Sequence, residues 1–310
     1  MRRDAARGDD ERRAAIDPNI PQAAFVEPER DADGTVRDVL TVLTTGRECV
    51  FDCVFCDLWK NTLPHATPPG ALVRQLDAVL AAHRPVGRGI RTIKLYNASN
   101  WFDPKAVPPT DEPAIAERLE GFDRVVVESH PKLCGPPAKR FADHLRGRLE
   151  VAVGLETAEP DRLARLSKAM DVGDFEAACE RLIGWGIAVR TFLLVPPPFA
   201  AGASDQEIGE RLVGESIRAA LEQGVGVVSL VPLRPGRLPD SSPPTYAMVR
   251  HALRSVALDW DAIRPHRLLD GDPTHPPRLF VDLWDAHLWC DAGERKRLEA
   301  WNRTQRTDVL

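Results

Sequence analysis

Short apolar runs alternate with longer amphipathic stretches along the chain, and this alternation limits the possible folds more than any other feature. The runs are rich in Val, Ile and Leu and cover residues 38–45, 90–97, 123–129, 149–156, 188–195 and 225–232. Between them, apolar residues recur at helical spacing over residues 69–80, 175–185 and 208–221. Near-continuous apolar strands that alternate with helices are typical of a parallel sheet covered by helices. We therefore expect an α/β fold, either a partial (β/α)6 TIM-like barrel or an open doubly wound sheet.

The expected barrel occupies residues 36–236 and is flanked by two segments of different character. Residues 1–35 begin with mixed charge and no apolar core, so we expect a flexible N-terminal arm without a secretory signal. A turn-rich stretch over residues 232–244 ends the alternation. Residues 237–310 are expected to form a C-terminal extension that caps the barrel. Its predicted parts are a helix near 245–258, an irregular stretch over 265–277, a short apolar run over 278–282 and a polar helix from about 291.

Composition and charge restrict the partners of the protein. Hydrophobic residues make up 43% of the chain and charged residues 28%, as in ordinary globular proteins. No apolar run approaches the ~18 residues of a membrane span, so we expect no membrane partner and a cytoplasmic location. The formal net charge is −5, and the short basic cluster at 295–297 is flanked by acids. Nucleic-acid binders usually show a basic face, so the charge does not indicate binding to transfer RNA.

Cys49, Cys53 and Cys56 stand within eight residues, as C-x3-C-x2-C, directly after the first predicted strand. Thiolates select soft ions, chiefly zinc and the irons of iron–sulfur clusters. A structural zinc site normally has four ligands, and here only His65 is a nearby candidate for the fourth. Three ligands leave one coordination position open, and an open position is where chemistry occurs. The spacing therefore predicts a metal centre on these cysteines and favours a cluster over zinc.

This cysteine spacing, with Phe55 just before the last cysteine, resembles the signature of the radical S-adenosylmethionine (radical SAM) enzymes. The resemblance implies a [4Fe-4S] cluster on the three cysteines, with SAM on the fourth iron and Phe55 beside its adenine. It also implies a partial barrel, reductive cleavage of SAM and removal of a hydrogen atom from a substrate. A reductant such as flavodoxin or ferredoxin would deliver the electron.

Polar residues follow the second and third predicted strands, where parallel barrels and sheets bind their ligands. Asn97, Ser99 and Asn100 stand where radical SAM enzymes often have a Gly-Gly-Glu segment, and the resemblance implies that Asn97 and Ser99 contact SAM. Glu128 follows three valines. An unpaired buried carboxylate is costly, so we expect Glu128 at the rim, where it could bind a ribose or an ammonium group. His130 is expected to be a structural histidine.

Two later segments resemble the branch of that family that contains the archaeosine-synthase radical partner and the elongator catalytic subunit. The first is Gly-Leu-Glu-Thr at 154–157, and the resemblance implies that Glu156 meets the SAM ribose and Lys168 the SAM carboxylate. The second is Pro-Pro-Phe at 197–199, where Val195 stands in place of the lysine of the branch. We expect Arg190 to point into the barrel as a cofactor contact, where it needs an anion partner. Ser229 and Arg234 are candidates for substrate contact.

The branch resemblance implies a modified nucleoside, free or in transfer RNA, as the substrate. A natural-product intermediate or other small metabolite is the alternative, and a zinc-stabilised binding protein is the rival from another class. The remaining cysteines are too widely separated for a second cluster. Cys134 is the candidate hydrogen donor, Cys179 is expected in the core, and Cys290 lies in the predicted cap.

Overall fold

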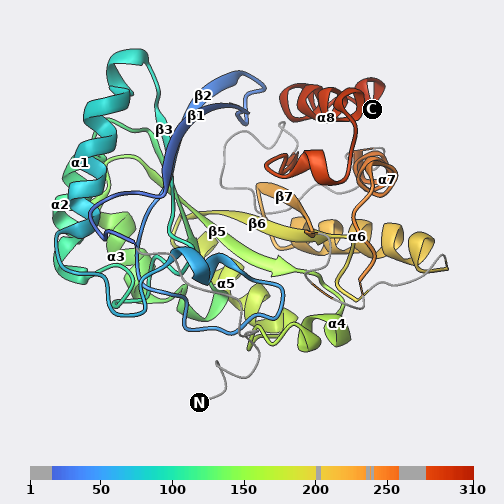
Figure 1. Cartoon of the computed structure of the whole chain (residues 1–310), viewed down its shortest axis with the longest axis horizontal. Helices are drawn as coiled ribbons and strands as arrows, with labels where there is room; N and C mark the ends of the chain where they lie inside the picture. Colours follow the sequence, from blue (N-terminus) through green and yellow to red (C-terminus); the bar gives the residue numbers. More distant parts are fainter. Residues whose placement is uncertain (1–15, 200–203, 235–237, 239–240, 258–276) are drawn as a thin grey trace. The chain divides into compact units, whose positions relative to one another are not determined.

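The computed structural model describes residues 16–199, 204–234, 238, 241–257 and 277–310. The chain forms two compact units. The first contains residues up to Glu27 together with Asp38–Val151, and the second contains Pro28–Arg37 together with Ala152–Leu310. Both contain strands and helices that alternate along the chain (Figure 1).

Eight strands join in one sheet, in the order in which they follow one another along the chain. They are β1 (Ala23–Arg30), β2 (Val36–Leu43), β3 (Thr92–Tyr96), β4 (Arg124–Ser129), β5 (Arg148–Glu156), β6 (Ala188–Val195), β7 (Val227–Pro232) and β8 (Arg278–Val281). The pairs β2–β3, β3–β4, β6–β7 and β7–β8 are parallel. Strands β2 to β7 correspond to the six predicted runs. This order confirms the predicted α/β fold of the partial TIM-like barrel type.

Strands β1 and β8 differ from the expectations. Strand β1 lies within the segment 1–35 that was expected to be a flexible arm, and β8 lies within the predicted cap but pairs with β7. Strand β1 is mostly half-buried and carries charged residues, so it lacks the continuous apolar run that marks the inner strands. Strand β8 has only four residues. The pattern of β1 therefore does not distinguish it from a loop, while β8 coincides with the short apolar run over 278–282, which was not assigned to the sheet.

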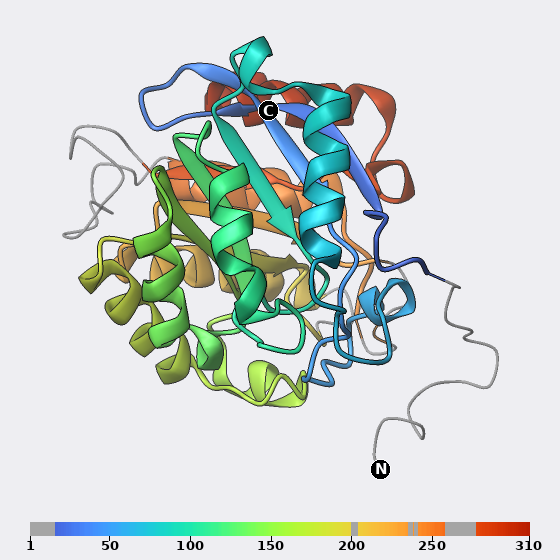
Figure 2. The same cartoon turned by 90° about the vertical axis from the view of Figure 1, so that its left-hand side faces the viewer.

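The helices of the first unit are α1 (Ala71–His83), α2 (Glu112–Arg118) and α3 (Pro136–His144). They follow one another along one face of strands β2 to β4 (Figure 2). Helix α1 confirms the amphipathic pattern predicted over 69–80, since Leu72, Gln75, Leu76 and Val79 are buried at spacings of three and four. Its last turn ends at Arg84, which adopts a left-handed conformation and precedes a proline.

The helices of the second unit are α4 (Pro160–Arg165), α5 (Val172–Gly184), α6 (Ser204–Glu222), α7 (Tyr246–Ala257) and α8 (Ala292–Thr304). Helices α5 and α6 pack on β6, while α8 packs on β8. Capping boxes at Asp171 and Asp291 explain where α5 and α8 begin. Helices α7 and α8 confirm the helices predicted after residue 244. The irregular stretch predicted over 265–277 lies, except for its last residue, outside the described residues.

No helix in the described ranges is both long enough and apolar enough to cross a membrane.

Candidate functional site

The three clustered cysteines lie in the first unit, on an irregular loop between β2 and a short 3-10 helix at Leu58–Asn61. Cys49, Cys53 and Cys56 are half-buried residues with free thiols. The base of the loop is held by a parallel bridge between Arg47 and Leu63 and by an ion pair of 2.9 Å between Arg47 and Asp103. The loop is therefore fixed at its ends, and its three cysteines are not completely buried.

The sulfur of Cys49 receives two N–H groups. The Asn100 side-chain nitrogen lies 3.1 Å from Sγ, and the Phe51 backbone nitrogen lies 3.4 Å from it. Asn100 follows β3, is 2% exposed, and accepts a hydrogen bond of 2.7 Å from the backbone N–H of His130. A buried side chain from another element thus contacts one of the predicted cluster ligands.

The cysteine loop also packs on the segment that follows β4. The ring of Phe51 stacks on the imidazole of His130, with centroids 3.6 Å apart and an interplanar angle of 19°. The imidazole Nδ1 accepts a hydrogen bond of 3.2 Å from the backbone N–H of Lys132, which fixes the orientation of the ring. Phe55, the predicted adenine contact, lies farther along the loop and is partly exposed.

Three buried donors at the end of β3 have no hydrogen-bond partner among the described residues. They are the side-chain nitrogen of Asn97, the hydroxyl of Ser99 and the indole nitrogen of Trp101. Leaving a buried donor unsatisfied costs roughly 1–3 kcal/mol, and such groups are rare in native proteins. A ligand with acceptor atoms would satisfy them. The sequence predicted Asn97 and Ser99 as site residues but not Trp101. The one sign in the sequence that could have identified Trp101 is its position two residues after Ser99.

Glu128 lies on β4 and holds the turn that contains these donors. Its Oε1 accepts hydrogen bonds of 2.7 Å from the backbone N–H groups of Asn97 and Ala98. Ala98 adopts a left-handed conformation with φ of 52°, which the two bonds help to maintain. Burial raises the pKa of Glu128 to about 7, although its backbone donors lower it. The structure gives this carboxylate backbone partners, while its predicted ligand contact stays a prediction.

The three cysteines outside the loop are buried or half-buried against other parts of the protein. Cys134 is completely buried, and its thiol donates to the carbonyl of His130 at 3.4 Å, which favours a structural role over hydrogen donation. Cys179 is completely buried on α5, in agreement with the expected core position. Burial and neighbouring carboxylates raise the pKa of Cys290, so its thiolate is disfavoured.

In the second unit, Glu156 and Lys168 contact each other. The Lys168 ammonium lies 2.5 Å from Glu156 Oε1 and donates to the Gly154 carbonyl at 2.6 Å. Both side chains are less than a tenth exposed. Glu156 ends β5 in a left-handed conformation with φ of 70°. Lys168, predicted to bind a carboxylate of SAM, thus has a protein carboxylate as its partner.

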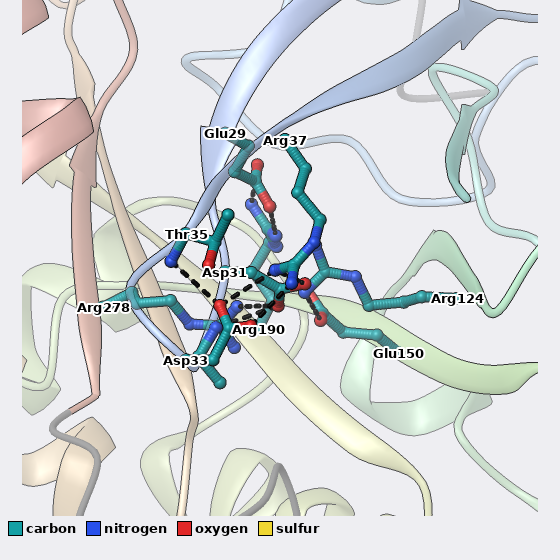
Figure 3. A network of polar contacts seen from close by, with 10 residues as sticks. Glu29, Asp31, Asp33, Thr35, Arg37, Arg124, Glu150, Arg190 and Arg278 are labelled. Carbon is teal, nitrogen blue, oxygen red and sulfur yellow. Dashed lines mark hydrogen bonds and ion pairs between the residues drawn. The ribbon is translucent and has the colours of Figure 1, made fainter. Parts of the chain in front are cut away.

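Arg190 on β6 was expected to need an anionic partner, and Glu29 of the protein itself is that partner. Its guanidinium forms hydrogen bonds of 2.7 and 3.2 Å to the two carboxylate oxygens of Glu29 on β1 (Figure 3). Beside this pair, Arg278 on β8 lies 3.4 Å from Asp31. Among the substrate candidates, Ser229 is nearly buried on β7 and Arg234 pairs with Asp285 at 2.6 Å.

The donor chemistry of the cysteine loop fits a soft metal centre, although the loop is not closed around one. Within the described residues, no three His, Cys, Asp or Glu side chains are grouped so as to hold a metal ion. Three half-buried cysteines on one irregular loop, with two N–H groups already directed at one sulfur, are nevertheless a suitable ligand set.

No family model matches the sequence, and no curated protein matches it. The fold, however, resembles solved structures. A radical SAM methyltransferase from Sphaerobacter thermophilus is 17% identical with a TM-score of 0.51, over 86% of this chain and 78% of that one. SuiB from Streptococcus suis, bound to S-adenosylmethionine, is 12% identical with a TM-score of 0.54, over 81% of this chain. The match covers 53% of SuiB, about half of its length.

Proposed function

We propose that the protein is a radical SAM enzyme in which Cys49, Cys53 and Cys56 hold a [4Fe-4S] cluster. The observation that carries this proposal is the C-x3-C-x2-C loop that follows β2, in a fold shared with a radical SAM methyltransferase and with a protein that binds S-adenosylmethionine. Its thiols suit iron, and the N–H groups at Cys49 suit a sulfur that bears negative charge. A reductant protein such as flavodoxin or ferredoxin would supply the electron.

The end of β3 is the proposed site for the polar groups of SAM. The unsatisfied donors of Asn97, Ser99 and Trp101 would bind acceptor atoms of this cofactor, and Glu128 would hold their turn in place. Phe55 is the proposed adenine contact. When bound, the cluster and SAM would supply reductive cleavage of the sulfonium and a carbon radical that removes a hydrogen atom from the substrate. The share of the protein is to position both and to exclude water.

Three residues of the second unit were expected to contact SAM, and two of them have modified roles in this proposal. Glu156 remains the proposed ribose contact. Lys168 and Arg190 already have carboxylate partners, so we assign them positioning roles in place of the direct SAM contacts expected from the sequence.

Two substrate classes are compatible with this chemistry. A modified nucleoside, free or in transfer RNA, is supported by the resemblance at 154–157. A small metabolite is supported by the charge, since many basic side chains of the described surface pair with acids. These pairs are Arg37–Asp33, Arg118–Asp77, Lys139–Asp143, Arg140–Glu112, Arg211–Glu215 and Arg295–Glu299.

Anaerobic reconstitution with iron and sulfide tests the proposal. We expect a brown protein that absorbs near ~400 nm and that forms 5′-deoxyadenosine from SAM on reduction. Alanine at any one of Cys49, Cys53 or Cys56 should abolish both, while Cys290→Ser, a partly exposed cysteine outside the loop, should retain both. Stoichiometric zinc in the purified protein, with no attainable cluster, would instead establish the zinc-stabilised binding protein.

Salt dependence of binding separates the substrate classes. A protein that contacts several phosphates of transfer RNA loses affinity steeply as salt rises, with a slope that counts the contacts. We expect such a slope only if transfer RNA is the substrate. Weak binding with no slope would direct the search to free nucleosides and other small metabolites, tested by product analysis after SAM cleavage.

A further inference from the structure

We propose that Asn100 is a positioning residue that donates a hydrogen bond to Cys49 and thereby raises the reduction potential of the cluster. This inference rests on the proposed function. It gives Asn100 a role toward a cluster ligand in place of a contact with SAM, and it follows from a contact between two residues that are 51 positions apart in the chain.

The orientation of the Asn100 amide is fixed by its other partner. The backbone N–H of His130 can only donate, and it lies 2.7 Å from the Asn100 Oδ1. The amide nitrogen must therefore be the atom that faces the Cys49 sulfur, at 3.1 Å. With its side chain 2% exposed, Asn100 loses little of this contact to competing water.

The backbone of Asn100 is also held. Its carbonyl accepts from the N–H of Asp103 at 3.1 Å, and the next N–H, of Trp101, donates to the carbonyl of Glu128 at 2.9 Å. The second donor to Cys49 is the N–H of Phe51, which belongs to the cysteine loop itself and moves with it. Asn100 donates from the turn that follows β3, and it therefore links this sulfur to the sheet.

The charge of the sulfur decides how much this contact is worth in each redox state. A hydrogen bond to a charged acceptor is roughly twice as strong as one to a neutral acceptor. One-electron reduction adds negative charge to a cluster and to its sulfurs, so a fixed donor stabilises the reduced form more than the oxidised form. Hydrogen bonds to the sulfurs are among the features that set iron–sulfur potentials. Removing the donor should therefore lower the potential.

Asn100→Asp is the sharpest variant. It keeps an oxygen for the N–H of His130 but replaces the donor to Cys49 by a carboxylate. Asn302→Asp is the matched control, since Asn302 on α8 also bridges two backbone groups, the N–H and the carbonyl of Val281, and contacts no sulfur. The readout is the midpoint potential of the reconstituted cluster, followed by electron paramagnetic resonance.

We expect Asn100→Asp to weaken electron binding at least tenfold, which is about 59 mV for a one-electron couple. Asn302→Asp should leave the potential unchanged. Asn100→Ala, which adds no charge, should shift the potential in the same direction and keeps the test open if the aspartate variant fails to load iron. Equal potentials in wild type and Asn100→Ala would overturn the role of Asn100 alone, whereas a wild-type protein without any cluster would overturn the proposed function and this inference together.

Discussion

Replacing Lys168 by methionine should destabilise the protein by about 3–5 kcal/mol, the cost of removing one partner of a buried ion pair. The Glu156 carboxylate is 9% exposed, and the Lys168 ammonium is its partner at 2.5 Å. Methionine keeps most of the aliphatic part of the lysine side chain, so the substitution leaves little cavity. The loss of unfolding free energy therefore measures the cost of a buried Glu156 carboxylate without its partner. The Gly154 carbonyl also loses a donor, which adds to the cost.

Thermal unfolding followed by circular dichroism measures this effect. At about 2–4 °C per kcal/mol for domains of this size, the melting temperature should fall by about 6–20 °C. Glu156→Gln alone should also destabilise, because it leaves the ammonium without its carboxylate. The double variant Lys168→Met with Glu156→Gln should recover part of both losses, since it buries no charge.

Two results would refute this reasoning. A Lys168→Met protein that melts within about 2 °C of the wild type would mean that Glu156 does not depend on Lys168. If the losses of unfolding free energy from the two substitutions simply add in the double variant, each substitution acts independently. The contact between the two side chains would then contribute no coupling energy.

Three further changes have defined outcomes. Gly154→Ala would bring Cβ into overlap with Glu156 Oε1 and to 2.5 Å from Lys168 Nζ, so we expect a loss of about 1–3 kcal/mol in the free energy of unfolding. An unchanged melting temperature would contradict this geometry. Arg190→Met should cost about 3–5 kcal/mol, because Glu29 is only 6% exposed, and the added change Glu29→Gln should restore part of it in the same assay. Glu128 has its pKa raised to about 7, so its ionisation opposes folding and stability should fall between about pH 4.5 and 7. Glu128→Gln, which keeps an oxygen acceptor, should flatten this dependence when melting temperatures at pH 5 and 8 are compared, and an identical pH profile would show that another group causes it.

The inner strands could be predicted because each is a continuous apolar run. In β4, Val125, Val126 and Val127 are completely buried, which is what a strand covered on both faces requires. Strand β1 could not be predicted in this way. Its Glu29 is buried and pairs with Arg190, 161 residues away, and no local pattern contains that pairing. The sequence alone therefore shows a charged, half-apolar segment that resembles an exposed arm.

For the candidate site, too, the sequence predicted what lies within one segment but not what depends on contacts between distant segments. The cysteine spacing predicts which side chains can bind a metal, because all three proposed ligands lie on one loop. The contacts of Lys168 and Arg190 depend on which carboxylates the fold brings near them. From the sequence, each was interpreted as a cation that binds an anionic ligand. In the fold, each pairs with a carboxylate of the protein itself.

The first unit links the cysteine loop to the sheet through a series of side-chain to backbone contacts. Glu128 on β4 holds the N–H groups of Asn97 and Ala98, and Asn100, farther along the same turn, holds Cys49. The turn is short, so a change at Glu128 reaches the cysteine loop through only a few residues. If the proposed cluster is present, Glu128→Gln should therefore shift its potential less than Asn100→Asp does, because the glutamine oxygen still holds the turn. A shift equal to that of Asn100→Asp would mean that the carboxylate charge acts on the cluster directly, and that the turn is not the route between them.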